Sequence, residues 1–258
     1  MRTIEGEGQE KLAADRTNLV AYAFRSYYHH HKLALPPGLR IACRNRIPVG
    51  SGMGSSASGV LLGLLGACAL SGRPASAEEL LTLAAAIEGH ADNAAAAIYG
   101  GLTVTVATGS NWLVRRFEVP VLQAALGLPD VHLPTQVARE ALPRHVPFAD
   151  AVFNAGRTPL VVEAFSCGDT DLLARCMDDR LHQPYRIRLV PGAAHSLAAG
   201  HAAGAAVALS GAGPSLVAFS AGDAESAGQA MRQAFERAGV QVRLFLMQTT
   251  SECAQISK

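Results

Sequence analysis

The stretch R-I-P-V-G-S-G-M-G-S-S-A-S, Arg46 to Ser58, constrains the fold of this chain more than any other segment. It follows an alternating run from Leu39 to Arg46, which predicts a strand, and it leads into an apolar helix-forming run that ends at Leu70. Glycines between a strand and a helix let several backbone N–H groups converge at the positive end of the helix dipole. The sequence therefore predicts a phosphate-binding loop, with a flexible turn and a plain helix start as the alternative.

Five residues carry this prediction. Gly50, Gly52 and Gly54 let the backbone approach a ligand, while Ser55 and Ser56 are able to cap the helix or to offer hydroxyls to phosphate or Mg²⁺. The stretch is not a Walker A loop, because the lysine of that motif is absent, and it is not the dinucleotide fingerprint, whose third glycine would fall on Ser55. The phosphate would thus be held by amides, hydroxyls and a metal ion.

The helix that follows the loop carries glycines at Gly59, Gly63 and Gly66, spaced four and three residues apart. Each glycine inside a helix lowers helix stability by about 1 kcal/mol relative to alanine, so three of them on one face indicate that a side chain is not tolerated there. We expect another backbone to lie close against this face.

The remaining periodicity predicts an α+β fold with two lobes, residues 1–165 and residues 166–258. A serine at Ser76 and a glutamate at Glu79 form a capping-box pattern ahead of a helix that Glu88 closes. The predicted helices cover residues 15–28, begun by Asp15 or Thr17, and residues 76–88, 138–142, 150–165, 170–181 and 224–238. The predicted strands cover residues 39–46, a hairpin over 102–119, and residues 206–210, 215–219 and 240–248.

Three adjacent histidines, His29 to His31, end the first predicted helix. A metal site is one interpretation, but neighbouring residues on a helix point in different directions, so the pattern favours a polar helix terminus. His90 and His182 are expected to make structural hydrogen bonds and not to act as bases.

Composition narrows the class of protein further. The formal net charge is +1, which argues against a nucleic-acid partner, and lysine occurs only at Lys11, Lys32 and Lys258, so an anion site must use arginine, amides or metal. The most apolar run, Val60 to Leu70, is shorter than the ~20 residues that cross a bilayer, and no leader pattern is evident. These features predict a cytoplasmic protein without a membrane partner. The scattered cysteines are expected to be reduced, buried thiols: Cys43, Cys68, Cys167, Cys176 and Cys253.

Several motifs together resemble one family. The loop Pro48 to Ser58 closely resembles the phosphate loop of the GHMP kinases, the superfamily of galactokinase, homoserine kinase, mevalonate kinase and phosphomevalonate kinase. Two further blocks, Glu88 to Gly101 and Leu209 to Ser215, are similar to the homoserine kinase block and to the C-terminal glycine motif of the superfamily. L-P-T-Q-V-A-R-E-A-L-P, D-A-V-F-N-A-G-R and D-R-L-H-Q-P-Y-R, the last ending at Arg186, also resemble homoserine kinases. The resemblance implies a two-lobe architecture, with an N-terminal lobe like the second domain of ribosomal protein S5 and a ferredoxin-like C-terminal lobe.

The resemblance also implies the ligands and the residues that bind them. The ligands would be ATP, Mg²⁺ and L-homoserine, phosphorylated on the way to threonine, with Ser56 and Glu88 on the metal. Asn93 stands where some relatives have a catalytic aspartate, and because an amide cannot take a proton it would orient the substrate hydroxyl. Arg139 would lie near the phosphoryl group. ATP would contact Asn18, Pro48, Val49, Gly50, Ser51, Gly52, Met53, Gly54, Ser55, Ser56, Ala57 and Ser58. Homoserine would contact Thr135, Arg186, Gly211 and Gly213.

Two features of the resemblance leave alternatives open. The opening motif usual in homoserine kinases is not matched, and the present start resembles a point about fifty residues into a typical member. The N-terminal lobe is therefore expected to be truncated, by a misplaced start or in a shortened paralogue. The alternative functions are a GHMP kinase for another small alcohol and a truncated nucleotide-binding pseudokinase. Family members often pair, so the resemblance also implies a homodimer.

Overall fold

The computed structural model describes residues 2–15, 17–109 and 111–257, which form two compact units. The first unit comprises Met1–Val49, Gly54–Phe117 and Ser251–Lys258, and the second comprises Gly50–Met53 and Glu118–Thr250. The predicted lobe division at residue 165 falls inside a helix of the second unit. The units divide elsewhere because residues 123–129 form a strand that pairs with two strands near the C-terminus.

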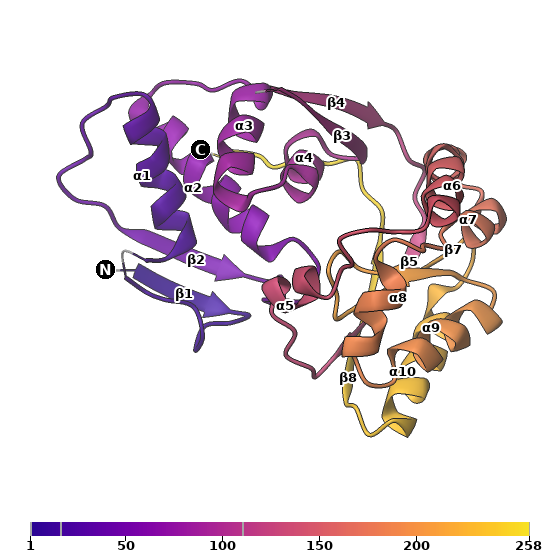
Figure 1. The fold of residues 1–258 in the computed structure, drawn as a ribbon. Helices are drawn as coiled ribbons and strands as arrows, with labels where there is room; N and C mark the ends of the chain where they lie inside the picture. Colours follow the sequence, from indigo (N-terminus) through magenta and orange to yellow (C-terminus); the bar gives the residue numbers. More distant parts are fainter. Residues whose placement is uncertain (1, 16, 110, 258) are drawn as a thin grey trace. The chain divides into compact units, whose positions relative to one another are not determined.

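The first unit contains two small sheets and four helices among its described residues (Figure 1). One sheet is a parallel pair, β1 with β2, and the other is an antiparallel hairpin, β3 with β4. The helices pack around one apolar core that includes Tyr27, Leu64 and Leu81. In chain order the elements are β1 (Arg2–Gly6), α1 (Leu19–His30), β2 (Ile41–Asn45), α2 (Ser55–Ser71), α3 (Ala77–Glu88), α4 (Asp92–Tyr99), β3 (Leu102–Thr108) and β4 (Asn111–Phe117).

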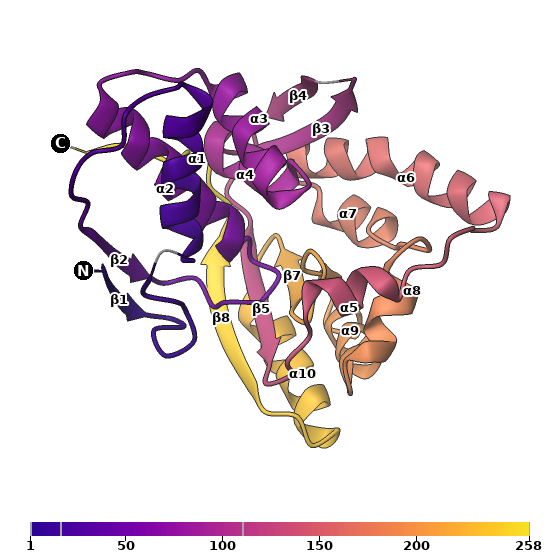
Figure 2. The same cartoon turned by 60° about the vertical axis from the view of Figure 1, so that its left-hand side comes forward.

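Helix α2 lies side by side with α1, as Figures 1 and 2 both show. The contact is closest at Gly63, where an added Cβ would overlap the Val20 carbonyl oxygen and lie 2.8 Å from the Ala23 Cβ. Gly59 is looser, with the Val20 side chain 3.8 Å away, and no heavy atom of the described residues lies within 4 Å of a Cβ at Gly66. The predicted close approach is therefore right for Gly63 and wrong for Gly66, because the α1 backbone touches α2 at Gly63 and no neighbouring segment faces Gly66 at that distance.

The second unit is built on a four-stranded antiparallel sheet in the order β6-β7-β5-β8. Its elements are β5 (Gln123–Pro129), α5 (Thr135–Glu140), α6 (Phe148–Cys167), α7 (Thr170–Cys176), α8 (Gln183–Arg186), the 3₁₀ helix η1 (Ile187–Leu189), α9 (Ala193–Ala202), β6 (Ala206–Leu209), β7 (Leu216–Ser220), α10 (Ala224–Arg237) and β8 (Val242–Gln248).

Helices cover both faces of this sheet. Val207 and Ala218 belong to an apolar cluster that includes residues of α9 and α10, whereas their chain neighbours Ala206 and Phe219 pack with α6 and α7. Because successive strand residues point to opposite faces, the two helix pairs lie on opposite sides of the sheet (Figure 2).

Most predicted elements are present, and the differences have local causes. Helix α1 begins later than predicted, because Asn18 is its N-cap, while Asp15 accepts hydrogen bonds from Thr17 in the preceding turn. β1, β5, α4, α8 and α9 were not predicted, since short or alanine-rich segments carry weak periodicity. Ser110, in the predicted hairpin turn, lies outside the described residues.

All five cysteines are free thiols, as expected. Cys68 and Cys176 are buried, as predicted. Cys43 is only partly buried, and Cys167 and Cys253 are exposed, so the prediction that all would be buried is wrong for these three. Among the described residues there is no helix with the length and apolar character needed to span a bilayer.

Candidate active site

The start of α2 is open in the way the glycine loop predicts. Gly54 is the N-cap residue, with φ 74° and ψ 24°, and within the described chain no side chain caps the helix. Ser55 and Ser56 occupy the first turn, so of the two uses considered for these serines the helix cap is wrong, and their hydroxyls stay candidates for phosphate or Mg²⁺. The first-turn N–H groups of α2 are consequently free of a side-chain cap, the arrangement in which helix starts bind anions.

Ser56 and Glu88 meet in the first unit, as predicted. The Ser56 hydroxyl on α2 donates a hydrogen bond to Glu88 Oε2, the last residue of α3, over 2.6 Å. Asn93 lies beside the loop, because a Cβ at Gly54 would come within 3.3 Å of its Oδ1. A hydroxyl, a carboxylate and an amide oxygen thus gather near the start of α2, and hard oxygen donors of this kind suit Mg²⁺.

Asn18 has a structural role in the first unit, which also contains both ends of the loop. The Asn18 Oδ1 accepts a hydrogen bond from the Val20 N–H, and its Nδ2 donates to the Ala13 carbonyl oxygen, so its side chain starts α1. Ala57 is buried in the core of this unit and Pro48 is buried, whereas Val49 is exposed and Ser58 half-buried. The predicted contact of Asn18 with adenine stays a prediction.

In the second unit, the segment Gly50–Met53 packs against the C-terminal glycine motif. The Ser210 hydroxyl donates to the Gly52 carbonyl oxygen over 3.0 Å, and a Cβ at Gly52 would overlap the Ser210 carbonyl oxygen. A Cβ at Gly211 would lie 3.1 Å from the Gly52 oxygen. Ser51 is buried, and its Oγ accepts a hydrogen bond from the Met53 N–H. Glycine is required at Gly52 because φ is +79° and the two backbones touch.

Arg186 lies on α8 and is held against α5. Its Nε donates to the Ala138 carbonyl oxygen over 3.1 Å, and its Nη1 lies 3.4 Å from His182 Nδ1. Burial and the nearby Arg139 guanidinium lower the pKa of Arg186. Thr135 and Arg139 are four residues apart on α5 and both exposed, so they share one face of that helix. The structure therefore brings Arg139 and Arg186 near each other, an arrangement that favours binding of an anion.

Sequence reasoning missed the residue that organises this region, Asp179. Its Oδ1 accepts hydrogen bonds from the N–H groups of Leu181, His182 and Gln183, and its Oδ2 accepts one from Asn154. Burial raises the pKa of this carboxyl, but the backbone and side-chain hydrogen bonds outweigh it and lower the pKa. The signal was in the sequence, because Asn154 and Asp179 belong to the two motifs D-A-V-F-N-A-G-R and D-R-L-H-Q-P-Y-R.

Gln183, His90 and His182 also make contacts that hold their segments in place. The Gln183 side chain is buried, and its Oε1 accepts a hydrogen bond from the Leu209 N–H, which ties α8 to β6. His90 Nδ1 lies 2.7 Å from Asp92 Oδ1, and burial, with Arg186 nearby, lowers the pKa of His182 despite the opposing Asp179 carboxylate. Both histidines thus have the structural partners that were predicted.

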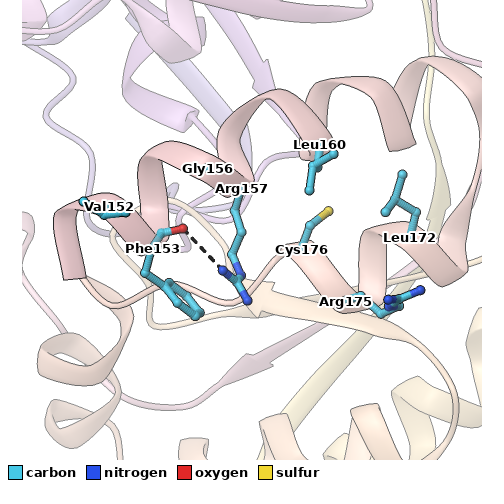
Figure 3. A pocket seen from close by; sticks show the side chains of 8 residues that line it. All are labelled: Val152, Phe153, Gly156, Arg157, Leu160, Leu172, Arg175 and Cys176. Carbon is cyan, nitrogen blue, oxygen red and sulfur yellow. Dashed lines mark hydrogen bonds between the residues drawn. The ribbon is translucent and has the colours of Figure 1, made fainter. Parts of the chain in front are cut away.

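A separate pocket lies in the second unit between α6 and α7, with a volume of about 480 Å³ (Figure 3). Its wall is mainly apolar, and the Arg157 guanidinium stacks 3.4 Å from the centroid of the Phe153 ring. Burial raises the pKa of the Cys176 thiol at its floor. None of the predicted site residues, all of which the structure describes, lines this pocket. The lining residues are Val152, Phe153, Gly156, Arg157, Leu160, Leu172, Arg175 and Cys176.

Comparison with known families fits this geometry. The family model described as "GHMP kinases N terminal domain" matches residues 18–101, and the one described as "GHMP kinases C terminal" matches residues 161–237. The chain therefore belongs to the GHMP kinases and, within them, to the homoserine kinase family. Membership makes it a phosphotransferase enzyme and confirms the predicted family and fold.

Individual relatives show how far the similarity extends. The chain is 41% identical to a homoserine kinase of Moorella thermoacetica over 240 residues, which covers 92% of this chain and 80% of that protein. It is 37% identical to a homoserine kinase of a Synechococcus species over 260 residues, covering 99% of this chain and 85% of that one. The crystal structure of homoserine kinase from Cytophaga hutchinsonii superimposes with a TM-score of 0.86 at 29% identity, over 97% of this chain and 82% of that chain.

Proposed function

We propose that this chain transfers the γ-phosphoryl group of ATP to the hydroxyl of L-homoserine, giving O-phospho-L-homoserine for threonine biosynthesis. The observation that carries the proposal is the Ser56–Glu88 hydrogen bond beside the open start of α2, in a chain related to homoserine kinases over most of its length. A small alcohol with a carboxylate also suits this chain, because the partly buried Arg186 is a candidate group for binding that carboxylate.

In this proposal the nucleotide phosphates bind the residues from Gly50 to Ser58, and adenine lies near Asn18. The free first-turn N–H groups of α2 supply the donors, and the helix dipole favours the negative charge. Ser56 and Glu88 fit a magnesium ion, because two oxygen ligands of one Mg²⁺ at right angles lie about 3 Å apart, close to their present 2.6 Å. Bound Mg²⁺ would neutralise charge on the phosphates.

Homoserine is assigned to the second set of residues. The planar guanidinium of Arg186 matches a carboxylate with two parallel hydrogen bonds, and Arg139 and Thr135 on one face of α5 serve the phosphoryl group or the amino acid. In the Gly211 to Gly213 turn the Gly213 N–H donates to the Ser210 carbonyl oxygen, so the N–H groups of Gly211 and Ala212 are the further donors in this proposal. Asn93 orients the substrate hydroxyl, so the rate enhancement rests on alignment and charge stabilisation, as phosphoryl transfer allows.

A coupled assay of ADP release tests the proposal. The purified chain with ATP and Mg²⁺ is expected to release ADP with L-homoserine and to yield O-phosphohomoserine detectable by ³¹P NMR. L-serine, D-homoserine and mevalonate serve as comparison acceptors, and the Glu88→Gln variant serves as the inactive control. Turnover with another alcohol but not with homoserine would contradict homoserine as the substrate and identify that alcohol as the acceptor. Calorimetric ATP binding without any transfer would instead support a pseudokinase.

A cytoplasmic location and a homodimer belong to the same proposal. Both follow from membership of an ATP-using family whose members often pair. Light scattering coupled to gel filtration measures the mass of the particle, and a mass equal to one chain would contradict the dimer.

A further inference from the structure

The end of the first helix carries a cluster that the kinase reaction does not use. His30 is the last residue of α1, His31 is its C-cap, and Glu79 lies in the first turn of α3. One ligand atom from each residue, an imidazole nitrogen or a carboxylate oxygen, lies within 4.8 Å of the other two. Glu79 Oε1 is 3.2 Å from His31 Nε2 and 3.9 Å from His30 Nε2. We propose that these three residues bind a zinc-class divalent cation.

His31 provides the strongest sign that a ligand is expected. Its side chain is only 3% exposed, and its ring packs 4.3 Å from the Tyr27 ring, measured between centroids. Its Nε2 is buried and makes no hydrogen bond to any described residue, although it lies 3.2 Å from the Glu79 carboxylate. A buried nitrogen without a hydrogen bond costs free energy, and a metal ion shared with the carboxylate would satisfy it.

The spacing of the three atoms matches ligands of one ion. Zinc lies about 2.0–2.2 Å from histidine nitrogens and carboxylate oxygens, and a tetrahedral angle then separates two ligand atoms by about 3.4 Å. The observed 3.2 and 3.9 Å bracket this value. His30 is 52% exposed on its side chain, so a small rotation brings its nitrogen to the same ion and leaves a position for water.

The chemistry of the donors selects the class of metal. Two imidazoles and one carboxylate suit Zn²⁺ or its neighbours in the transition series, whereas Mg²⁺ prefers oxygen ligands alone. The sequence argument against a histidine site fails because His31 is the C-cap residue of α1, where the helix ends. The adjacent rings of His30 and His31 meet edge to face, with centroids 4.8 Å apart, and both approach Glu79.

The bound cation would link the end of α1 to the start of α3, at the opposite ends of these helices from Asn18 and Glu88. Asn18 begins α1 and His30 ends it, while Glu79 lies near the start of α3 and Glu88 ends it. Each helix has 12 residues, which corresponds to about 18 Å. A cation there would stabilise the fold without touching the proposed nucleotide site.

Zinc titration of the untagged full chain, freed of metal by chelation and without nucleotide, tests the proposal. We expect one Zn²⁺ per chain by calorimetry and a rise in Tm of roughly 5 °C at saturating zinc. His30→Ala and Glu79→Gln should each weaken zinc binding by about tenfold or more. These two side chains are partly exposed, so both variants are expected to fold.

Matched controls separate this site from other zinc-binding groups. His29→Ala removes the exposed neighbouring histidine and should leave zinc affinity unchanged, as should Glu88→Gln. Burial and then the positive charge of Arg73 lower the pKa of His31. The same charge repels a divalent cation, so Arg73→Ala should tighten zinc binding severalfold. Removing zinc should lower Tm and leave kcat within about twofold. Zinc that fails to bind, or that binds equally in His30→Ala and Glu79→Gln, would overturn the proposal.

Discussion

The two sets of candidate site residues are positioned by different forces. Ser56 and Glu88 sit on α2 and α3, which pack through an apolar core, and the contact at Gly63 sets how closely α2 lies to α1 in the same core. Arg186 is positioned by hydrogen bonds, with Asp179 and Gln183 holding the segment before it. In the first region, the residues proposed for catalysis differ from the apolar residues that stabilise the fold. In the second region, the same hydrogen-bonding groups stabilise the fold and position the substrate-binding residue. Substitutions in the first region should therefore change either activity or stability, whereas substitutions in the second should change both.

The largest expected effect is the loss of activity in Glu88→Gln. An amide is a poorer ligand for Mg²⁺ than a carboxylate, so kcat/KM should fall about 10²–10³-fold. Tm should change by less than about 2 °C, because Glu88 is only half-buried and an exposed hydrogen bond adds little to stability. Glu78→Gln, at an exposed position of the same helix, is the control for both measurements. Unchanged activity would remove Glu88 from the metal site.

Arg186→Lys should give a smaller loss, confined to the amino-acid substrate. Lysine cannot reproduce the paired hydrogen bonds to a carboxylate or the Nε bond to the Ala138 oxygen. We expect the KM for L-homoserine to rise about 10²-fold, with the KM for ATP within twofold. Arg188→Lys, at an exposed position of η1, is the matched control. Steady-state kinetics with each substrate varied would contradict the assignment if only the KM for ATP changed.

A pair of glycines tests the packing side of the comparison. Gly63→Ala forces a methyl group into the Val20 backbone and should destabilise the protein by about 2 kcal/mol. Gly66→Ala meets no described atom within 4 Å and should stabilise it by about 0.5–1 kcal/mol through helix propensity. Urea unfolding with an unchanged m value measures both. Equal effects from the two variants would show that the α1–α2 crossing does not govern this region.

Sequence patterns predicted what depends on local order along the chain. The glycine loop, the helix after it and three of the four strands of the second unit, β6, β7 and β8, were found because their signals occupy neighbouring positions. Ser56 and Glu88 were expected to act together, and they lie 2.6 Å apart. Their catalytic roles, like those of Asn93 and Arg139, stay predictions.

What sequence reasoning missed depends on contacts between distant segments. Asp179 looks like an ordinary acidic residue until Asn154, on α6, is seen to donate to it. Gly63 and Gly66 are equivalent in spacing, and only the path of α1 distinguishes them. His31 was set aside by a rule that holds within a helix and not at its C-cap.

Asp179→Asn tests the hydrogen-bonded side of the comparison through its pH dependence. Burial raises the pKa of Asp179, but the N–H groups of Gln183 and His182 and the side chain of Asn154 stabilise the carboxylate, so the folded pKa lies below its ordinary value. The charged form therefore adds stability that is complete above the unfolded-state pKa and is lost as pH falls through the folded one. At pH 7 the variant should be less stable by about 2 kcal/mol and should have a raised KM for homoserine, since the segment before Arg186 loosens.

Urea unfolding from pH 7 downward should show this difference constant until about pH 4 and shrinking below it. Asp178→Asn, at the exposed neighbouring position, should show neither the loss nor the pH dependence. The Gly63→Ala difference, which arises from packing, should stay the same across this range, because no proton is involved. If Asp179→Asn instead lost stability equally at every pH, a steric fault and not the carboxylate would account for it, and the division between a packed region and a hydrogen-bonded one would fail.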